Sequence, residues 1–582
     1  MANETEVDVA QFTIKINGDD MPRTIELIGV HITKAINKIS MAKIVIKDGD
    51  VSTNDFVLSK SDLLIPGNEI QISAGGVDGQ SLVFSGIIVK QSVSIRGNKN
   101  PQLIIDCRHK AVKATIVRRS NCLHNVTDDA AITSALKASG LSDSEMEIET
   151  TTVTHPEMVQ YDCTDWDFAV SCAETAGKVV LTNDDKIVIK APDVTATASH
   201  SVLFGATSGA TIIELDAEMD SRTQYKSVVA KAWDKANQQL AEATASEPSL
   251  PNFGNMDGST LADVNAQAEC ILQHGGGISS EEIQQWADAG LLKSRLSKIR
   301  GRVKFDGTTN VNAGDIIELQ GLGDRFNGNA FVSGIRHDYT IKEGWKTQAQ
   351  FGQSPDWFVQ EPDVVSPKAG AMLPGTNGLL TGIVTDNEDP EGEFRVRVKI
   401  PIINADDDGV WARMALSDAG NNRGMFFRPE INDEVLLGFL FDDPRQPVII
   451  GMLHSSALAS PLQPSNDNQQ KGYTSREKLV LLFDDDKKSV VIKTPGGNSV
   501  TLSDDAKGIS LEDQNGNKIT MDDKGIVIQA TQKIELKAGT QLAIGAPNLA
   551  MSADTACEIK GAATKLESAG VLTLTGAMVK IN

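Results

Sequence analysis

The last ninety or so residues, 490–582, carry a short repeat that limits what this chain can fold into. One aliphatic residue marks each step, and from Ile528 onward the marks return every seven or eight residues. Inside most steps a second apolar residue stands two places earlier, and this spacing puts both side chains on one face of a strand. The residues that we expect to form the core are Ile492, Leu502, Leu511, Met521, Ile526, Ile528, Ile534, Leu536, Leu542, Ile544, Met551, Ile559, Leu566, Leu574 and Ile581.

Strands this short cannot bury an apolar face within one chain, and no helical period offers a covering layer. Repeats of this kind must stack on neighbours. Three identical chains wound about one axis would form a triangular prism filled by the aliphatic residues, with no free sheet edge. At about 4.8 Å per strand, twelve repeats predict a shaft of about 55–60 Å. The expected outward positions are polar: Thr501, Ser503, Lys518, Gln529, Lys533, Glu535, Lys537 and Lys560.

This pattern predicts a rigid trimeric needle. An ordinary β-sandwich and a flexible repeat tail are the alternatives, and neither accounts for so regular a period.

The formal charge of -23 is unevenly distributed along the 582 residues. Residues 471–582 hold 14 basic and 14 acidic side chains, so the needle is neutral, whereas residues 366–470 hold 8 basic and 15 acidic ones, a net of -7. An acidic body repels phosphate backbones, so we expect no nucleic-acid partner. Aromatic residues make up only 5% of the chain, and Gly, Thr, Ser and Val are frequent, which is typical of an all-β protein.

The six cysteines show no CxxC or paired spacing, which favours free thiols in a reducing compartment. The sequence MANETEVDVA has neither a basic start nor an apolar run, so we expect no signal peptide. No apolar stretch is long enough for a transmembrane helix. We therefore expect cytoplasmic assembly, followed by release in a particle without the general secretory route.

The fold class that we predict is mainly β, with two β-barrel hub domains and short helices, an OB-fold barrel and an intertwined trimeric β-helix. Helices are expected at 128–139, after an N-cap at Thr164 or Asp165, and at 279–300, and the polar stretch 236–277 is interpreted as a loop excursion. The predicted domains are hub barrel 1 at 1–125, a mixed α/β segment at 126–184, hub barrel 2 with a helical insert at 185–365, a linker at 366–382, the OB-fold collar at 383–455, a linker at 456–474 and the needle at 475–582.

Two stretches of the N-terminal part carry a family resemblance. The text DWDF, followed by AE and a glycine and then by a short β pair, resembles the hub domain of VgrG, the spike protein of bacterial type VI secretion; related hubs occur in phage tails and extracellular contractile injection systems. A later stretch, from GDIIELQ to GWKTQ, is similar to the second barrel of the same hub. The matching residues, which we interpret as structural, are Trp166, Phe168, Gly177, Gly314, Asn327, Gly328 and Trp345.

Residues 383–455 contain five strand-like runs, the size of an OB-fold barrel. Their turns closely resemble the OB domain of VgrG proteins. The matching residues are Gly392, Val396, Pro401, Trp411, Arg413, Pro429, Asp433, Val435, Pro444 and Pro447. An oligonucleotide-binding face needs basic and aromatic groups. Because this region is acidic, we interpret it as a structural collar.

We predict no catalytic, cofactor or metal site. His337 has no accompanying cluster of histidine, cysteine or acidic residues, so a structural role is expected. The acidic run 406–408 cannot direct three consecutive carboxylates at one calcium ion, and the run 513–518 is better explained by a hairpin turn through Asn515 and Gly516. The sequence contains no GxSxG, HExxH or Walker A motif.

The resemblance implies a homotrimeric, non-enzymatic spike of a contractile injection machine. Its expected partners are the inner tube and baseplate proteins, a PAAR-type tip protein and effector cargo, and it would meet the target membrane only transiently. Type VI secretion, an extracellular injection system and a phage-like tail remain open. The competing functions are a spike that degrades the cell wall and a trimeric adhesin or tailspike.

Overall fold

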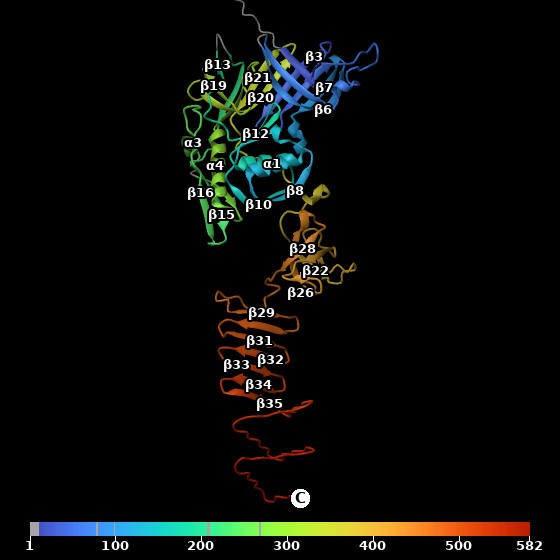
Figure 1. Ribbon diagram of the computed structural model, residues 1–582, viewed down its shortest axis with the longest axis vertical. Coiled ribbons are helices and arrows are strands. Elements are labelled where there is room, and N and C mark those ends of the chain that lie inside the picture. Colours follow the sequence, from blue (N-terminus) through green and yellow to red (C-terminus); the bar gives the residue numbers. More distant parts are fainter. Residues whose placement is uncertain (1–10, 77–78, 98, 206–209, 267–268, 582) are drawn as a thin grey trace, which may run out of the picture. The chain divides into compact units, whose positions relative to one another are not determined.

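The computed structural model describes residues 11–76, 79–97, 99–205, 210–266 and 269–581. The chain divides into two units, which are treated separately. The first unit holds residues through 376 together with 441–443, and the second holds 377–440 and 444–582 (Figure 1). Within the described residues, no helix combines the length and the apolar character needed to cross a membrane.

A large antiparallel sheet is the framework of the first unit. Its strands run in the order β14-β18-β21-β20-β3-β4-β7-β6-β5-β1-β2, and β19 joins β20 and the short β13 at its side. The strands are β1 (Gln11–Ile16), β2 (Asp19–Asp20), β3 (Leu27–Ala35), β4 (Met41–Lys47), β5 (Glu69–Gly76), β6 (Gly79–Arg96), β7 (Lys99–Arg108), β13 (His200–Leu203), β14 (Glu214–Met219), β18 (Ile299–Asp306), β19 (Ile316–Gln320), β20 (Gly328–Thr340) and β21 (Gly344–Phe351).

The sheet covers two separate hydrophobic cores, one for each predicted hub region. Alternate residues of β3, β4, β5 and β7 point inward in the first core, including Ile32, Ile44 and Ile70. Phe305 and Phe351 are fully buried in the second core. The antiparallel pair β3 and β20 joins the two regions, so the sheet runs without a break from one core to the other.

Between the two regions lies a mixed segment with the predicted helices. Its elements are β8 (Arg118–Thr127), α1 (Asp128–Ala138), β9 (Met146–Ile148), β10 (Thr154–Thr164), α2 (Asp165–Thr175), β11 (Val179–Asn183) and β12 (Lys186–Lys190). The hydroxyl of Thr164 accepts a hydrogen bond from the backbone N–H of Asp167, which confirms the expected N-cap of α2. After α2, Gly177 takes a φ of +69°, a conformation that suits glycine at a helix end.

The stretch 236–277 is structured, so its interpretation as a loop was wrong. It contains β16 (Gln239–Thr244), α3 (Gly258–Val264) and β17 (Glu269–His274), and β15 (Ser227–Asp234) pairs with both strands. The helix α4 (Ser280–Leu296) packs its apolar side on this sheet through Ile283 and Ala287. It ends before the predicted Arg300 because β18 begins at Ile299. Alanines in this stretch, such as Ala241 and Ala243 of β16, give a much weaker strand pattern than branched residues do.

The second unit begins with a closed barrel, which confirms the predicted OB-fold. Its strands close in the order β22-β23-β24-β28-β27. They are β22 (Leu380–Asp386), β23 (Val396–Lys399), β24 (Val410–Met414), β27 (Glu434–Phe439) and β28 (Pro447–Met452), with a small hairpin of β25 (Ala419–Gly420) and β26 (Arg423–Gly424) between β24 and β27. Val384, Val398 and Leu437 are among its buried core residues.

The buried His337 of the first unit is a structural residue, as its surroundings indicate. Its side chain is 2% exposed, its Nδ1 lies 2.9 Å from the hydroxyl of Thr347, and its ring centroid lies 5.7 Å from that of Trp345. Burial lowers the pKa of His337 to about 3. Among the described residues, no group of three histidine, cysteine or acidic side chains is arranged to hold a metal ion.

We predict that His337 makes the first unit less stable in acid. The unfolded chain takes up a proton near pH 6.5 and the folded chain only near pH 3, so stability is complete above pH 6.5 and falls as the pH is lowered toward 3. The difference between the two pKa values corresponds to about 3–5 kcal/mol in the free energy of unfolding. In urea titrations followed by tryptophan fluorescence, His337→Gln should flatten this dependence, whereas Thr347→Val, which keeps the histidine, should retain it. An equally steep dependence in His337→Gln would contradict the prediction.

Candidate trimer interface

The C-terminal part of the second unit starts as a sheet in which each strand pairs antiparallel with the next. Its strands are β29 (Gln470–Thr474), β30 (Val480–Asp484), β31 (Ser489–Lys493), β32 (Ser499–Ser503), β33 (Gly508–Glu512), β34 (Lys518–Asp522) and β35 (Gly525–Gln529). Short polar turns join them, such as the one at 513–517, where the carboxylate of Asp513 accepts hydrogen bonds from the N–H groups of Asn515 and Asn517. The hairpin expected through Asn515 and Gly516 is therefore confirmed.

The register of this sheet gathers apolar side chains into two columns on one face. Directly paired residues form each column, and the two columns are offset by two residues along every strand, which keeps them on the same side. The first column is Tyr473, Leu481, Ile492, Val500, Leu511, Ile519 and Ile528, and the second is Phe483, Val490, Leu502, Ile509, Met521 and Ile526. We call these thirteen residues the apolar face.

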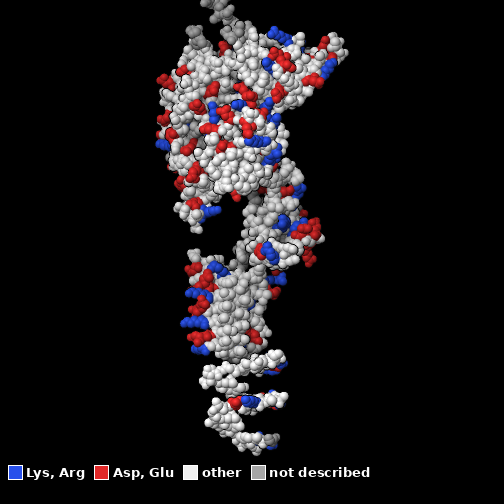
Figure 2. Space-filling view, viewed as in Figure 1, with Lys and Arg blue, Asp and Glu red and all other residues white. Residues whose placement is uncertain are grey.

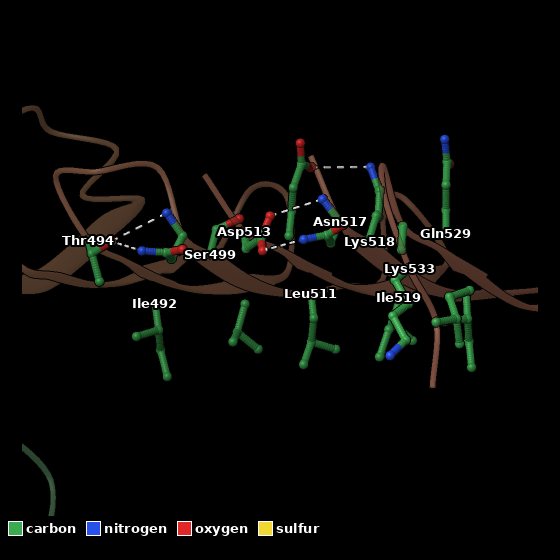
Figure 3. A pocket seen from close by; sticks show the side chains of 16 residues that line it. Ile492, Thr494, Ser499, Leu511, Asp513, Asn517, Lys518, Ile519, Gln529 and Lys533 are labelled. Atoms are coloured by element: carbon green, nitrogen blue, oxygen red, sulfur yellow. Dashed lines mark hydrogen bonds and ion pairs between the residues drawn. The ribbon is translucent and has the colours of Figure 1, made fainter. Parts of the chain in front are cut away.

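The opposite face of the sheet is mostly polar, although Leu482, Val491 and Val527 also lie on it. The residues between the apolar ones include Thr501, Ser503, Lys518 and Gln529, four of the predicted outward positions. Figure 3 shows Ile492, Leu511 and Ile519 on one side of the strands and Asn517, Lys518 and Gln529 on the other. Lys518 Nζ also lies 3.3 Å from a carboxylate oxygen of Glu512 on the same side. The sheet therefore has one face suited to water and one that is not.

Nothing in the described chain covers the apolar face. Ile492 is 51% exposed, Ile528 54% and Ile526 67%, although each lies in a regular strand. In Figure 2 the side of this sheet turned to the viewer carries almost no charge, and charged side chains gather along its edges. A contiguous apolar surface of this kind marks a contact with another molecule.

From residue 530 the chain changes character. Among the described residues 530–581 there is no assigned strand and no hydrogen bond between backbone groups. Figure 1 shows this run continuing beyond β35 as passes set apart from one another. Backbone N–H and C=O groups need partners in a folded structure. The described chain supplies only a few side-chain partners for this run, such as Asn517 Oδ1 for the N–H of Thr531 and Ser568 Oγ for the N–H of Gly570, so most partners must come from water or from other chains.

The prediction that three chains share every layer from residue 490 onward was wrong for its first part. Residues 470–529 pair within one chain, because the longer intervals there leave room for turns, and the sheet starts inside the stretch assigned to a linker at 456–474. The structure brings six predicted core residues together on the apolar face: Ile492, Leu502, Leu511, Met521, Ile526 and Ile528. The other nine are exposed, and of these Ile534 borders the apolar face in a hollow that Ile519 and Ile528 also line; the nine are Ile534, Leu536, Leu542, Ile544, Met551, Ile559, Leu566, Leu574 and Ile581.

In residues 530–581, charged side chains alternate with apolar ones, as they would along a strand with one apolar face. Lys533 forms an ion pair with Glu535, Lys560 with Glu558, and in each pair the partners are two residues apart. The residue between them, Ile534 in the first pair, is one of the exposed aliphatic residues. Each pair therefore flanks an aliphatic residue, which is the alternation that a strand with one apolar face would need.

The hub and OB residues of the family motifs do not converge on one site. In the first unit, Trp166 and Phe168 are buried on α2, Trp345 packs against Phe12, and Gly314 and Gly328 take positive φ angles of +92° and +124°. A Cβ at Gly328 would stand 2.3 Å from the carbonyl oxygen of Asn252, so this position requires glycine. The side-chain oxygen of Asn327 accepts a hydrogen bond of 2.7 Å from the N–H of Leu322.

In the barrel, the motif residues serve the fold. Val396 and Val435 are buried in its core, Trp411 and Arg413 lie on β24, Pro447 begins β28, and Gly392, Pro401, Pro429, Asp433 and Pro444 lie in the connections. One of them, Asp433, accepts a hydrogen bond of 2.8 Å from the N–H of Glu430 and so fixes the turn before β27. These contacts hold the loops of the barrel and assemble no chemical site.

Family models match three parts of the chain. Residues 6–342, more than half of the chain, match the Alg8 N-terminal domain. Residues 380–454 match the type VI secretion system and phage-baseplate injector OB domain, and residues 489–582 match the phage baseplate V C-terminal trimerisation domain.

Two type VI secretion system spike proteins of Pseudomonas aeruginosa are relatives: VgrG1b, 25% identical over 239 residues, and VgrG1a, 26% identical over 242. The OB and trimerisation domains and these relatives identify a VgrG-type spike protein.

Each match with these spike proteins covers 38% of this chain and only about a third of the curated relative, 31% for VgrG1b and 36% for VgrG1a. Among solved structures, the chain is similar to a tail protein of Neisseria meningitidis, with 13% identity, coverage of 61% of this chain and 99% of that one, and a TM-score of 0.44. It is also similar to a type VI secretion component of Escherichia coli, with 10% identity, coverage of 76% and 99%, and a TM-score of 0.39.

Most of the apolar face lies within the matched trimerisation domain. Its role in holding the trimer together can therefore be tested by substitution. We predict that Leu502→Asp weakens the trimer, because each copy loses an apolar contact of about 2–5 kcal/mol and gains a buried charge. Thr501→Asp, one residue away on the polar face, is the matched control and should leave the trimer intact. Mass photometry before and after mild heating measures the trimer. Equal behaviour of the two variants would rule out this face as the interface.

Proposed function

We propose that three copies of this chain form the central spike of a contractile injection machine. The observation that carries the proposal is the exposed apolar face, followed by a run, 530–581, whose described residues form no hydrogen bond between backbone groups. Three copies related by a threefold axis would cover each other's apolar faces and would supply the missing strands of residues 530–581. This arrangement agrees with the match of 489–582 to a trimerisation domain.

The proposed role is mechanical. A prism in which every strand has neighbours and the interior is filled by aliphatic side chains is stiff along its axis. Driven by contraction of a sheath, such a needle would puncture a target envelope, while the first unit joins the inner tube and the baseplate. In this role the spike meets the membrane only transiently, is assembled in the cytoplasm, and carries a PAAR-type tip protein and effectors.

Residues 530–581 provide the sharpest test of the needle. Ile544 is 60% exposed in the single chain, and in the proposed trimer three copies would meet near the axis. We predict that Ile544→Asp prevents assembly of the needle, because three carboxylates cannot be buried together without partners. Ala543→Asp, on the outward side, should assemble normally.

Particles isolated from producing cells should deliver cargo with Ala543→Asp and fail with Ile544→Asp, and limited proteolysis should cut only the latter between 530 and 582. A soluble trimer of Ile544→Asp with unchanged protease resistance would contradict the proposal.

The matched relatives are spike proteins by name, and we propose that this chain, too, is no enzyme. Purified protein should therefore release no fragments from peptidoglycan or polysaccharide under conditions in which a lysozyme control does. Cleavage by the purified chain would instead support the rival function of a wall-degrading spike.

A further inference from the structure

The OB domain of the second unit carries two exposed features that neither the barrel fold nor the needle explains. One is a pair of protruding phenylalanines, Phe394 and Phe426, which are 78% and 76% exposed. The other is an apolar hollow lined by Met414, Leu416, Met425, Phe427, Met452 and Tyr473. We call these features the knob and the hollow.

The knob is held in an unfavourable conformation by a dense set of contacts. Phe394 has a φ of +58°, a left-handed conformation that is uncommon for a bulky residue and strains the backbone. The guanidinium of Arg428 donates hydrogen bonds to the carbonyl oxygens of Phe394 and Arg395, at 2.9 and 2.6 Å. Arg395 in turn forms a two-pronged pair with Asp389 at 2.8 and 2.9 Å. The loop is thus built to present Phe394 to the outside.

The hollow is apolar, adaptable and open. Phe427, Met452 and Tyr473 on its wall are 42–50% exposed. Methionine side chains adapt their shape to an inserted aromatic ring and contact it favourably. The hollow therefore suits an aromatic side chain.

The knob and the hollow lie on different sides of one segment. Along residues 425–428, Met425 and Phe427 line the hollow, whereas Phe426 and Arg428 line a second depression beside Phe394. Alternate side chains thus separate the two features, and Phe394 does not reach the hollow of its own chain. A ring with threefold symmetry needs this arrangement, because each copy must offer two different surfaces to its two neighbours.

The hollow is continuous with the apolar face. The ring centroids of Phe427 and Tyr473 lie 4.9 Å apart, and Tyr473 is the first residue of the first apolar column, paired with Leu481. A neighbouring chain that covers the apolar face would also reach the hollow. The occupant is therefore a second copy of this chain.

We propose that Phe394 and Phe426 of each chain insert into the hollow of the next chain and close the three OB domains into a ring. This inference rests on the trimer of the proposed function and adds a second contact to it, outside the matched trimerisation domain. The OB domain then acts as a specific coupler between chains and fixes which surfaces meet.

Cross-linking of the full-length chain tests the ring. In a background in which the exposed Cys122 and Cys557 are replaced by serine, the double variant Phe394→Cys with Met452→Cys is treated with a short bismaleimide. Most chains should then run as covalent dimers and trimers on a denaturing gel. Each single variant, and the control Ile402→Cys with Met452→Cys, should stay monomeric on the gel; Ile402 is 80% exposed in the same domain and lies outside both features.

Light scattering on the same samples distinguishes the ring of OB domains from the trimer itself. A trimer in solution that gives no cross-link in the double variant would overturn the ring and leave the needle trimer standing. Monomers in solution before cross-linking would overturn the proposed function and the ring together. A cross-link of equal yield in the Ile402 control would also overturn the ring, because it would show contact without specificity.

Discussion

The structure of the second unit depends on one mismatch between hydrogen bonding and burial. Through β35 the chain pairs its own backbone strand by strand, yet the strands expose a continuous apolar face to water. After residue 530 the backbone groups of the described residues also form no hydrogen bonds with one another. Toward its C-terminal part the chain therefore depends more and more on other molecules. In β29–β35 it lacks a cover for its apolar side chains, and after residue 530 it also lacks neighbouring strands.

This gradient assigns different tasks to the two parts of the needle. The sheet β29–β35 has its register fixed by its own turns, so three such sheets could meet with their columns already aligned. Residues 530–581 have no turns of this kind and can take their register only from neighbouring chains. A self-paired segment directly before an intertwined one supplies a starting register, since a slip of one residue would turn Ile534 outward and Lys533 inward.

The sequence predicted the kinds of element well and their pairing partners less well. The caps of α2, the closed OB barrel and the outward position of Thr501 follow from local pattern, because each depends on residues close in sequence. The change of pairing near Ile528 was visible as a shorter, stricter interval, but spacing alone does not say whether the next strand belongs to the same chain. The strands β16 and β17 were missed, and in β16 the residues packed against the core include Ala241 and Ala243, because alanine gives little strand signal.

The charges of the OB domain also support a structural collar. Arg395 is paired with Asp389, Arg423 with Asp418, and Arg397 lies 3.5 Å from a carboxylate oxygen of Asp408. These guanidinium groups are engaged in loops of their own domain, so the net charge of -7 understates how few cations are left to meet a phosphate backbone. The pair of Arg395 and Asp389 also holds the loop that presents Phe394. In this domain, charged pairs fix the geometry of the loops, and exposed aromatic side chains are left to offer contacts.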